Sequence, residues 1–416
     1  MTEHRMPPTA LPHARTGGAD AAPAPTGLSN CDAALERYGA KGRAWLDGMW
    51  QADPLADAVV NDPGGAGPAL RAIRGMLDDG AGVVPEGAPA SARALAEQIT
   101  TDPEWLERDR LDRAADVLVR YSAQWGLVLG AASLLAGADN WIAARPLLMT
   151  GRYGHQPAVR SIEVGEWLSE VVRPGGMEVG GPGFARTVRV RLIHAHVRRH
   201  IGSGADWDLA AWGVPVPQPY MAFTLAEFGH ISLAAMEHLG VVLRPDELDD
   251  IYHLWRYVGF LIGVDPALNP VEAADQIAIE ELYHLTSPGP DDYSREFVRA
   301  LTEDYLAPQL ATLLVGPDRL RQDVSRRLMY GMSRVFLGDR AADALAIPDG
   351  PAKHVVRALR PGLVLADRAR LRLLGRDRVT AQGYLARDRE LARLKAEHAM
   401  THDLVDAVPG AVGHTT

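Results

Sequence analysis

Apolar residues recur at helical spacing over most of this chain, and strand-type alternation of apolar and polar residues is scarce. A charged stretch over residues 360–400 contains many Glu/Asp–Arg pairs and predicts long surface helices. The other predicted helices cover residues 89–99, 104–137, 160–172, 186–201, 222–239, 245–264 and 271–285. The pattern therefore predicts an all-α fold.

The ends of the chain differ from its middle. Residues 1–30 are rich in Pro, Ala, Gly and Thr and show no periodicity, so we expect a disordered N-terminal tail there. No Pro/Gly/Ser linker divides the middle, which predicts a single domain over residues 31–400 and a C-terminal tail over 401–416. Of the 416 residues, 47% are hydrophobic, and a chain of this size buries roughly three quarters of its unfolded surface. A large core with an enclosed pocket is therefore feasible.

One predicted helix, TVRVRLIHAHVRRHI over residues 187–201, carries three histidines. At about 100° per residue, only His194 lies on its apolar side, flanked by Arg191 and Arg198 at i−3 and i+4. The His194 side also carries Thr187, Val190, Val197 and Ile201, and the opposite side carries Arg189, His196, Arg199, His200 and Ser203. The helix is therefore predicted to bury one imidazole and to leave the other two near water.

An inward-facing imidazole is compatible with two kinds of site. His194 would suit an iron ligand, and the guanidinium groups of Arg191 and Arg198 could hold the propionates of a haem. A core histidine hydrogen-bonded to a carbonyl is the commoner outcome for this pattern alone. The helical pattern leaves both interpretations open.

The stretch RVRLIHAHVRRHI resembles the histidine helix of the latex-clearing-protein family, the b-type haem rubber oxygenases, and of the wider group of MpaB-type oxygenases. Further segments resemble the family in the same order, over about residues 35 to 380. They are DPLADAVV (53–60), TGRY (150–153), VPVPQPYMAFTLAEF (214–228), YHLWRYVGFLIGVD (252–265) and FLGDRAADALAIP (336–348). The resemblance implies a globin-like helical core with additional surrounding helices, and one haem b with its iron.

The same resemblance implies site residues. It places the proximal iron ligand at His194. The family's distal side carries an Arg, then a Lys three residues later, then a Thr, and these positions hold Arg160, Glu163 and Val164 here. Because the Lys and the Thr are replaced, the reaction is expected to differ from the cleavage of polyisoprene rubber.

Arg160 and Glu163 would share one face of a helix, and two effects compete for the charge of Glu163. Burial favours the neutral acid, whereas a close guanidinium favours the carboxylate. A neutral Glu163 could donate a proton during activation of the oxidant, and an ionised Glu163 could orient a substrate N–H or O–H. The plain alternative is a surface ion pair without a catalytic role.

We therefore predict a haem b-dependent oxygenase or oxidase that hydroxylates, desaturates or oxidatively cleaves a small organic metabolite, using O2 or peroxide with or without an external electron donor. Three alternatives stay open: a rubber-type polyisoprene-cleaving dioxygenase, a non-catalytic haem-binding protein and a di-iron carboxylate oxidase. The last rests on two E-x-x-H pairs, Glu227–His230 and Glu281–His284, a spacing that di-iron helical bundles use.

Charge and termini bear on partners and location. The formal net charge of −10 argues against nucleic acid and anionic membranes as partners. The single cysteine, Cys31, excludes an internal disulfide, and the N-terminus shows no apolar signal region and no twin arginine. We therefore expect a cytoplasmic protein. The uncharged run over residues 121–138 is expected to be a buried core helix, because it contains several polar and small residues.

Overall fold

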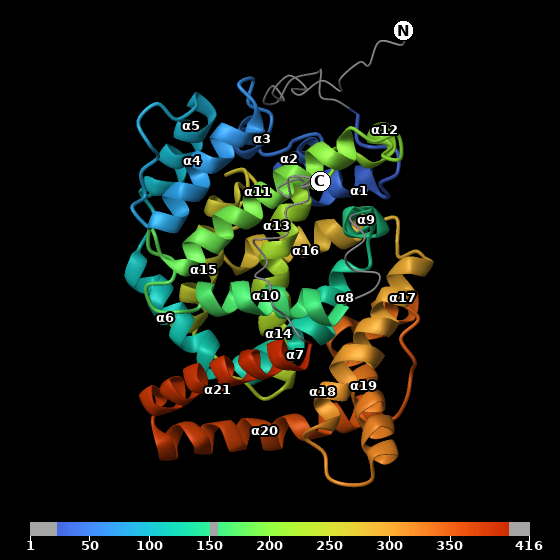
Figure 1. The fold of residues 1–416 in the computed structure, drawn as a ribbon. Coiled ribbons are helices and arrows are strands. Elements are labelled where there is room, and N and C mark those ends of the chain that lie inside the picture. The colour runs from blue at the N-terminus through green and yellow to red at the C-terminus, as the bar shows by residue number, and fades with distance from the viewer. Residues whose placement is uncertain (1–22, 150–156, 399–416) are drawn as a thin grey trace, which may run out of the picture.

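The computed structural model describes residues 23–149 and 157–398, and every regular element in these two ranges is a helix (Figure 1). The predicted all-α fold is confirmed, whereas the globin-like character of the core and the single-domain organisation stay predictions. Three elements are single-turn π-helices, which occur frequently at functional sites: η1 (Leu129–Ser133), η2 (Glu227–Ile231) and η3 (Leu301–Leu306). The first of these contacts both others.

Short helices form the N-terminal part of the fold: α1 (Cys31–Tyr38), α2 (Ala40–Gly48), α3 (Pro54–Val60), α4 (Ala66–Asp79) and α5 (Ala90–Thr100). Helix α3 begins where the sequence supplies a cap. The Asp53 side chain accepts a hydrogen bond from the backbone N–H of Ala56 at 3.3 Å, and Pro54 occupies the first helical position. One face of α3 packs against α4 and α5, and α3 also contacts α11.

The apolar pattern over residues 104–137 forms four elements rather than one helix: α6 (Arg108–Arg120), α7 (Ser122–Val128), η1 and α8 (Leu134–Gly137). The break falls at Tyr121, whose hydroxyl donates to Asp367 at 3.1 Å. Helix α6 starts later than the predicted residue 104, because residues before it form a turn and His253 Nε2 accepts the Glu107 N–H at 3.0 Å.

The middle of the chain builds the core around α15, which is buried along most of its length. Trp255 of α15 lies among Trp125, Trp167 and Phe228, with ring centroids 5.1–6.4 Å apart. The elements of this middle part of the chain are α9 (Trp141–Met149), α10 (Pro157–Val171), α11 (Pro182–Gly202), α12 (Leu209–Trp212), α13 (Gln218–Ala226), η2, α14 (Ser232–His238), α15 (Pro245–Ile262) and α16 (Ala273–Thr286). This aromatic cluster fixes α7, α10 and η2 against α15.

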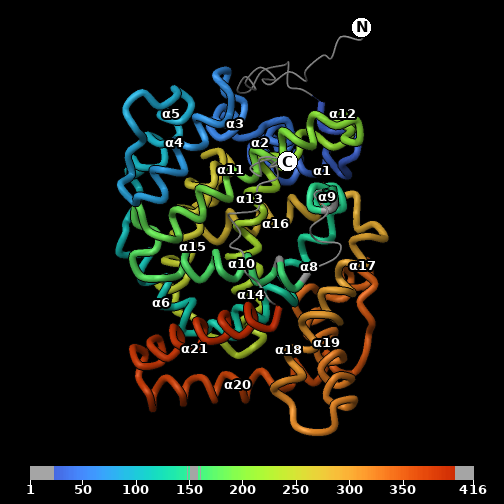
Figure 2. Tube along the Cα trace, in the orientation of Figure 1, coloured from blue at the N-terminus to red at the C-terminus, as the bar shows by residue number. Residues whose placement is uncertain are grey.

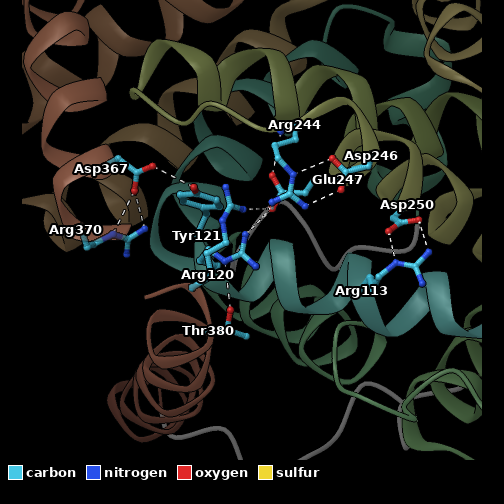
Figure 3. A network of polar contacts seen from close by, with 11 residues as sticks. Arg113, Arg120, Tyr121, Arg244, Asp246, Glu247, Asp250, Asp367, Arg370 and Thr380 are labelled. Carbon is cyan, nitrogen blue, oxygen red and sulfur yellow. Dashed lines mark hydrogen bonds and ion pairs between the residues drawn. The ribbon is translucent and has the colours of Figure 1, made fainter. Parts of the chain in front are cut away.

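The C-terminal part comprises α17 (Asp292–Ala300), η3, α18 (Ala307–Ala311), α19 (Asp318–Ala344), α20 (Ala352–Leu374) and α21 (Arg376–Glu397). Helices α20 and α21 run side by side along one end of the molecule, as predicted for residues 360–400 (Figures 1 and 2). Glu247 of α15 anchors α21, because its carboxylate accepts from Arg376 at 2.5 Å and from Arg120 of α6 at 2.7 Å (Figure 3). Asp367 of α20 binds Tyr121 in the same network.

Part of the predicted 1–30 tail, residues 23–30, is described by the structure. Residues 23–30 are held by the backbone hydrogen bonds of Thr26 to Ala210, of Gly27 to Ala211 and of Ser29 to Thr286. These contacts order a segment whose composition alone predicts disorder. Residues 1–22 and the 401–416 tail lie outside the described residues.

Within the described ranges, no single helix combines the length and the apolar character needed to cross a membrane. Ser122–Gly137 and Trp141–Leu147 reach that length and composition only as a pair, bent by 113°. The bend falls just after the uncharged run over residues 121–138, where the sequence predicts one buried helix. Many of its residues are buried, among them Trp125, Val128 and Leu135, but the run is divided between α7, η1 and α8.

Candidate functional site between α10, α11 and α13

Helices α10 and α11 form an antiparallel hairpin with a fixed register. The indole N–H of Trp167 donates to Thr187 Oγ1 at 2.9 Å. Closer to the connecting turn, a Cβ at Gly183 would lie only 2.6 Å from the carbonyl oxygen of Glu170, so the two helices approach there as only glycine allows. The hydrogen bond and this contact together set which residues of the two helices face one another.

This register places the predicted distal and proximal positions level with each other. Residue 160 lies seven positions before Trp167, and His194 lies seven positions after Thr187, so both are about two turns from the same hydrogen bond. The Arg160 side chain lies outside the described residues. Glu163, one turn from Trp167, is half-buried. The hairpin thus brings the His194 and Glu163 segments to the same part of the fold.

His194 is half-buried and lies at the border of the buried face of α11, not at its centre. The prediction that the other two histidines both lie near water is correct for His200 but wrong for His196, which is half-buried. Burial lowers the pKa of His196, and the nearby positive charges of Arg74 and Arg199 add to this effect. His194 thus lies partly exposed at the border of the buried face.

Arg191 occupies the centre of that buried face and is bound on all sides. Its Nε and Nη2 donate to the two carboxylate oxygens of Asp53 at 2.6 and 2.9 Å, and its Nη1 donates to Gln98 at 2.6 Å and to the carbonyl of Leu261 at 3.2 Å. The side chains of Arg191 and Asp53 are only 3% and 1% exposed. This guanidinium joins α11 to α3, α5 and α15.

Arg198 makes a similar contact one turn beyond His194. Its Nε lies 3.0 and 3.2 Å from the carboxylate oxygens of Asp57, and its Nη1 donates to the carbonyl of Val216 at 2.8 Å. Val216 has a positive φ of 52°, a strained conformation for a β-branched residue. Arg198 therefore holds the loop that leads into α13. Because both guanidinium groups are bound to aspartates, we do not expect either arginine to bind a haem propionate.

The sequence analysis missed Asp53 and Asp57. They are four residues apart, on the first turns of α3, and they meet two arginines that are seven residues apart on α11. No pattern along either helix reveals this pairing, because the partners lie 138 and 141 residues apart in the chain. The pairing explains why the 53–60 segment accompanies the histidine helix, because each supplies half of a buried ion-pair ladder.

Arg145 of α9 is a cation of a different kind. Its guanidinium carbon lies 4.5 Å from the ring centre of Trp212 and 5.6 Å from that of Trp141. No carboxylate or carbonyl of the described residues is within hydrogen-bonding distance of it, and its Nε is shielded from solvent. Since α9 contacts α11, Arg145 is a cation on that side of the fold that can receive an anionic group.

The E-x-x-H pairs do not converge on a metal site. Glu281 binds Arg37 and Tyr38 of α1, whereas His284 Nδ1 lies 2.9 Å from Asp139 and His230 Nε2 lies 3.7 Å from Glu280. Within the described residues, no group of three or more His, Cys, Asp or Glu side chains could hold a metal ion. The geometry therefore gives no support to the di-iron alternative.

A polar stripe runs along α13 into η2. Tyr220, Thr224 and Glu227 follow at i, i+4 and i+7 and are all partly uncovered, whereas the other residues from 221 to 229 are buried. Yet Tyr220 and Glu227 lie deep in the protein, and burial raises the pKa of both side chains. A deeply placed residue with uncovered surface borders a space inside the fold. From partial accessibility at such depth we infer that the stripe borders a space inside the fold; its first turn follows the loop that Arg198 holds.

Glu227 is the most unusual member of this stripe. Burial raises the pKa of its carboxyl to about 8, and no hydrogen bond or ion pair to that carboxyl is found among the described residues. Its Oε1 occupies the place where a Cβ of Gly137 would be, so α8 needs glycine at this contact. The Tyr283 hydroxyl donates to the Gly137 carbonyl at 2.6 Å. The described residues therefore provide no partner for this carboxyl, and its burial favours the protonated form.

The comparisons with known proteins identify the family. The model of the "ER-bound oxygenase mpaB/B'/Rubber oxygenase, catalytic domain" family matches residues 119–368, which is more than half of the chain. The chain belongs to this oxygenase family. The family assignment confirms the predicted resemblance and shows, at this coarse level, that the protein is an oxygenase. The match includes α10, α11, α13 and η2.

A solved structure supports the fold of this mpaB/rubber oxygenase family member. The chain is similar to the "Structure of Latex Clearing Protein LCP in the closed state", with a TM-score of 0.58 and 18% sequence identity. The similarity covers 80% of this chain and 89% of the other. No curated protein matches the chain significantly.

The residues of this family member fit a haem in three respects. His194 is a partly exposed histidine level with the distal helix, and its Nδ1 is shielded from solvent. Val164 of α10 and Val190 of α11 pack against the hydrophobic core and supply apolar surface, as a macrocycle requires. Arg145 is a cation that can bind a carboxylate of the haem. Arg191 and Arg198 cannot do so, because they are bound to Asp53 and Asp57. The fit is therefore good for the ring and its iron and shifts the propionate contact to another arginine.

Proposed function

We propose that this protein is a haem b-dependent oxygenase or oxidase of a small organic molecule, with His194 as the proximal ligand of the iron. The observation that carries the proposal is the α10–α11 register, which sets His194 level with the distal positions inside the region that matches the oxygenase family. The bound haem would supply an iron centre that reacts with O2 or peroxide. The oxidant, an external electron donor and a cytoplasmic location belong to the proposal.

The residues of this chain would have separate tasks. His194 would hold the iron through one ring nitrogen, while its Nδ1 is shielded from solvent. Asp53 and Arg191 would hold α11 in place from its buried face. Arg145, rather than Arg191 or Arg198, would bind a propionate through its unoccupied N–H groups. A non-catalytic haem-binding protein would need none of the polar groups that line the internal space.

The decisive experiment is the absorption spectrum of the purified protein, with and without added hemin and imidazole. The wild type should show a strong Soret band, and His194→Ala should lose most of its haem. His196→Ala and His200→Ala are matched controls on the same helix and should keep it, since they lie away from the His194 side. A folded wild type that stays colourless after hemin is added would contradict the proposal.

Glu163 and Arg160 would act on the distal side. Glu163 is half-buried on α10, one turn from the Trp167 contact that fixes the hairpin, so it can hold or move a proton near the iron. Glu163→Gln should leave the resting haem spectrum unchanged and slow the reaction of the haem-loaded protein with hydrogen peroxide by roughly 100-fold. Glu170→Gln, on the same helix but paired with Arg173, should react at the normal rate. Equal rates for both variants would remove Glu163 from the reaction.

Rubber cleavage is the second candidate function, since the family name includes rubber oxygenases. The substrate of a rubber oxygenase is a pure hydrocarbon chain, which offers no hydrogen-bonding atom. The polar stripe of Tyr220, Thr224 and Glu227 favours a smaller and partly polar substrate instead.

A further inference from the structure

Glu227 is a buried acid that the proposed proximal and distal residues leave unexplained. Buried polar groups in proteins almost always have a hydrogen-bond partner, and a group without one indicates an unseen water or ligand. The Glu227 carboxyl has no partner among the described residues, although its backbone carbonyl accepts from Ser133 at 2.7 Å. Its main chain is therefore fixed by the protein while its carboxyl is left unsatisfied.

Several features of the fold define the surroundings of the Glu227 carboxyl. The residue begins the π-helical turn η2, which contacts a second π-helical turn, η1. On the side of α8, Gly137 leaves room for the carboxyl. The next residue, Phe228, packs on Trp167 of the distal helix at 5.3 Å between ring centroids. The η2 turn is thus in contact with the helix that carries Glu163.

No cation neutralises Glu227 in the described fold. Burial raises the pKa of Tyr283 of α16, the Glu227 carboxyl, Tyr220 of α13 and Asp139 after α8 add to this effect, and none of these groups is positively charged. His284 of α16 is directed to Asp139, and His230 of η2 is directed to Glu280 of α16. The η1 turn contributes no titratable residue. The surroundings therefore favour the protonated carboxyl, which can donate one hydrogen bond.

The other members of the stripe make side-chain hydrogen bonds within the protein. Asn140 Nδ2 donates to the Tyr220 hydroxyl at 3.3 Å, and the Thr224 hydroxyl donates to the Tyr220 carbonyl at 3.0 Å. Phe223 stacks on Tyr283 at 3.5 Å between ring centroids and closes the wall beside them. Glu227 is thus the member of the stripe whose side chain makes no hydrogen bond among the described residues, while the Tyr220 hydroxyl, which accepts from Asn140, keeps its own hydrogen as a second donor.

We propose that Glu227 binds the substrate by donating a hydrogen bond from its carboxyl to a carbonyl or hydroxyl oxygen of a mostly apolar small molecule in the internal space. This inference rests on the proposed function for the meaning of "substrate", but the binding site itself does not require haem. It names the substrate class as an oxygen-containing molecule with an apolar body, and it excludes a plain hydrocarbon and a cationic amine.

Three probes with the same arrangement of non-hydrogen atoms test the proposal: acetophenone, α-methylstyrene, which replaces the carbonyl by C=CH2, and 1-phenylethylamine, which is a cation at pH 7. Binding is measured by isothermal titration calorimetry on the full-length purified protein, and haem content is measured separately from the absorption spectrum. Failure of the haem proposal is then visible in the spectrum, and failure of this proposal is visible in the titrations.

Wild-type protein should bind acetophenone roughly three- to tenfold more tightly than α-methylstyrene, the worth of one hydrogen bond. Glu227→Leu should abolish that difference, and Glu237→Gln, an exposed glutamate farther along the same run of helix, should preserve it. Glu227→Gln keeps the shape and an N–H donor, so it should retain the preference if the leucine variant is poorly folded.

The pH dependence provides a second, independent test. Above about pH 8 the Glu227 carboxyl ionises and can no longer donate, so the preference for acetophenone should fall in the wild type but not in Glu227→Gln. A preference that survives in Glu227→Leu would overturn the proposal. So would tighter binding of 1-phenylethylamine that depends on Glu227, because it would show an ionised carboxylate.

Discussion

Two regions of this protein bury carboxyl groups, and they treat them in opposite ways. Between α3 and α11, Asp53 and Asp57 each meet an arginine, and the pair formed by Asp53 is almost fully buried. Between η1 and η2, Glu227 meets no cation and no hydrogen-bond donor of the described residues. The first arrangement fixes the position of a helix. The second leaves a polar group that has no partner in the described part of the chain.

This difference distinguishes buried carboxyl groups that hold helices in place from a buried carboxyl group that can bind a ligand. A carboxylate bound bidentately by a guanidinium has its lone pairs occupied and cannot bind anything else. A neutral acid that borders an internal space keeps its proton available for a ligand. Arg191 and Arg198 were expected at the cofactor because of their sequence spacing, yet their aspartate partners give them a structural role.

Breaking the paired region should have the largest effect. Asp53→Ala leaves the Arg191 guanidinium buried without its partner and removes the cap of α3, so the free energy of unfolding should fall by about 3–5 kcal/mol. Urea denaturation followed by circular dichroism measures this change. Asp53→Leu combined with Arg191→Met should recover much of the loss, because no charge is then left buried. A single variant as stable as the double variant would show that the ion pair is not buried as described.

Replacing the unpaired acid Glu227 should raise the free energy of unfolding, not lower it, and the size of this effect should depend on pH. The Glu227 pKa is raised from 4.5 to about 8 in the folded protein, so the folded state keeps a proton that the unfolded state has released. Relative to Glu227→Gln, the wild type should therefore lose roughly a few kcal/mol of stability as the pH rises from about 4.5 to about 8, and no more above that. Parallel stability curves for the two proteins over this range would contradict a neutral buried acid.

An exposed pair gives the smallest expected effect and serves as the control. Glu296 and Arg299 lie three residues apart on α17, with side chains 60% and 50% exposed. Glu296→Gln should leave the unfolding midpoint unchanged within error, since solvent screens such pairs. A large effect there would mean that charge alone, and not burial, distinguishes the two regions.

Much of the fold could be predicted from the sequence, because its signals are local. The period of apolar residues gave α11 and α15 within a few residues of their ends, and the Asp53–Pro54 cap marks the start of α3. The breaks could not be predicted in this way. Tyr121 interrupts a helical pattern because its hydroxyl binds Asp367, 246 residues away in the chain.

The candidate site was predictable only in part, for the same reason. His194 can be recognised from the apolar pattern of its own helix, which is a local signal, and the family resemblance points to the same residue. The ion pair of Asp53 with Arg191 joins residues 138 positions apart, and no pattern along α11 reveals it. Glu227 was noticed only as part of an E-x-x-H spacing. Its lack of a partner depends on Gly137 and on the packing of η1 against η2, which are properties of the folded chain.

The contact between α21 and α10 has a consequence for the order of events during synthesis. Lys395 of α21 binds the buried Glu166 of α10, and Arg387 donates to the Val172 carbonyl at its end. The helix that carries Glu163 is therefore braced by residues that leave the ribosome more than two hundred positions after it. A nascent chain would hold this wall of the interior only loosely, so a cofactor could enter before the last helix locks the wall in place.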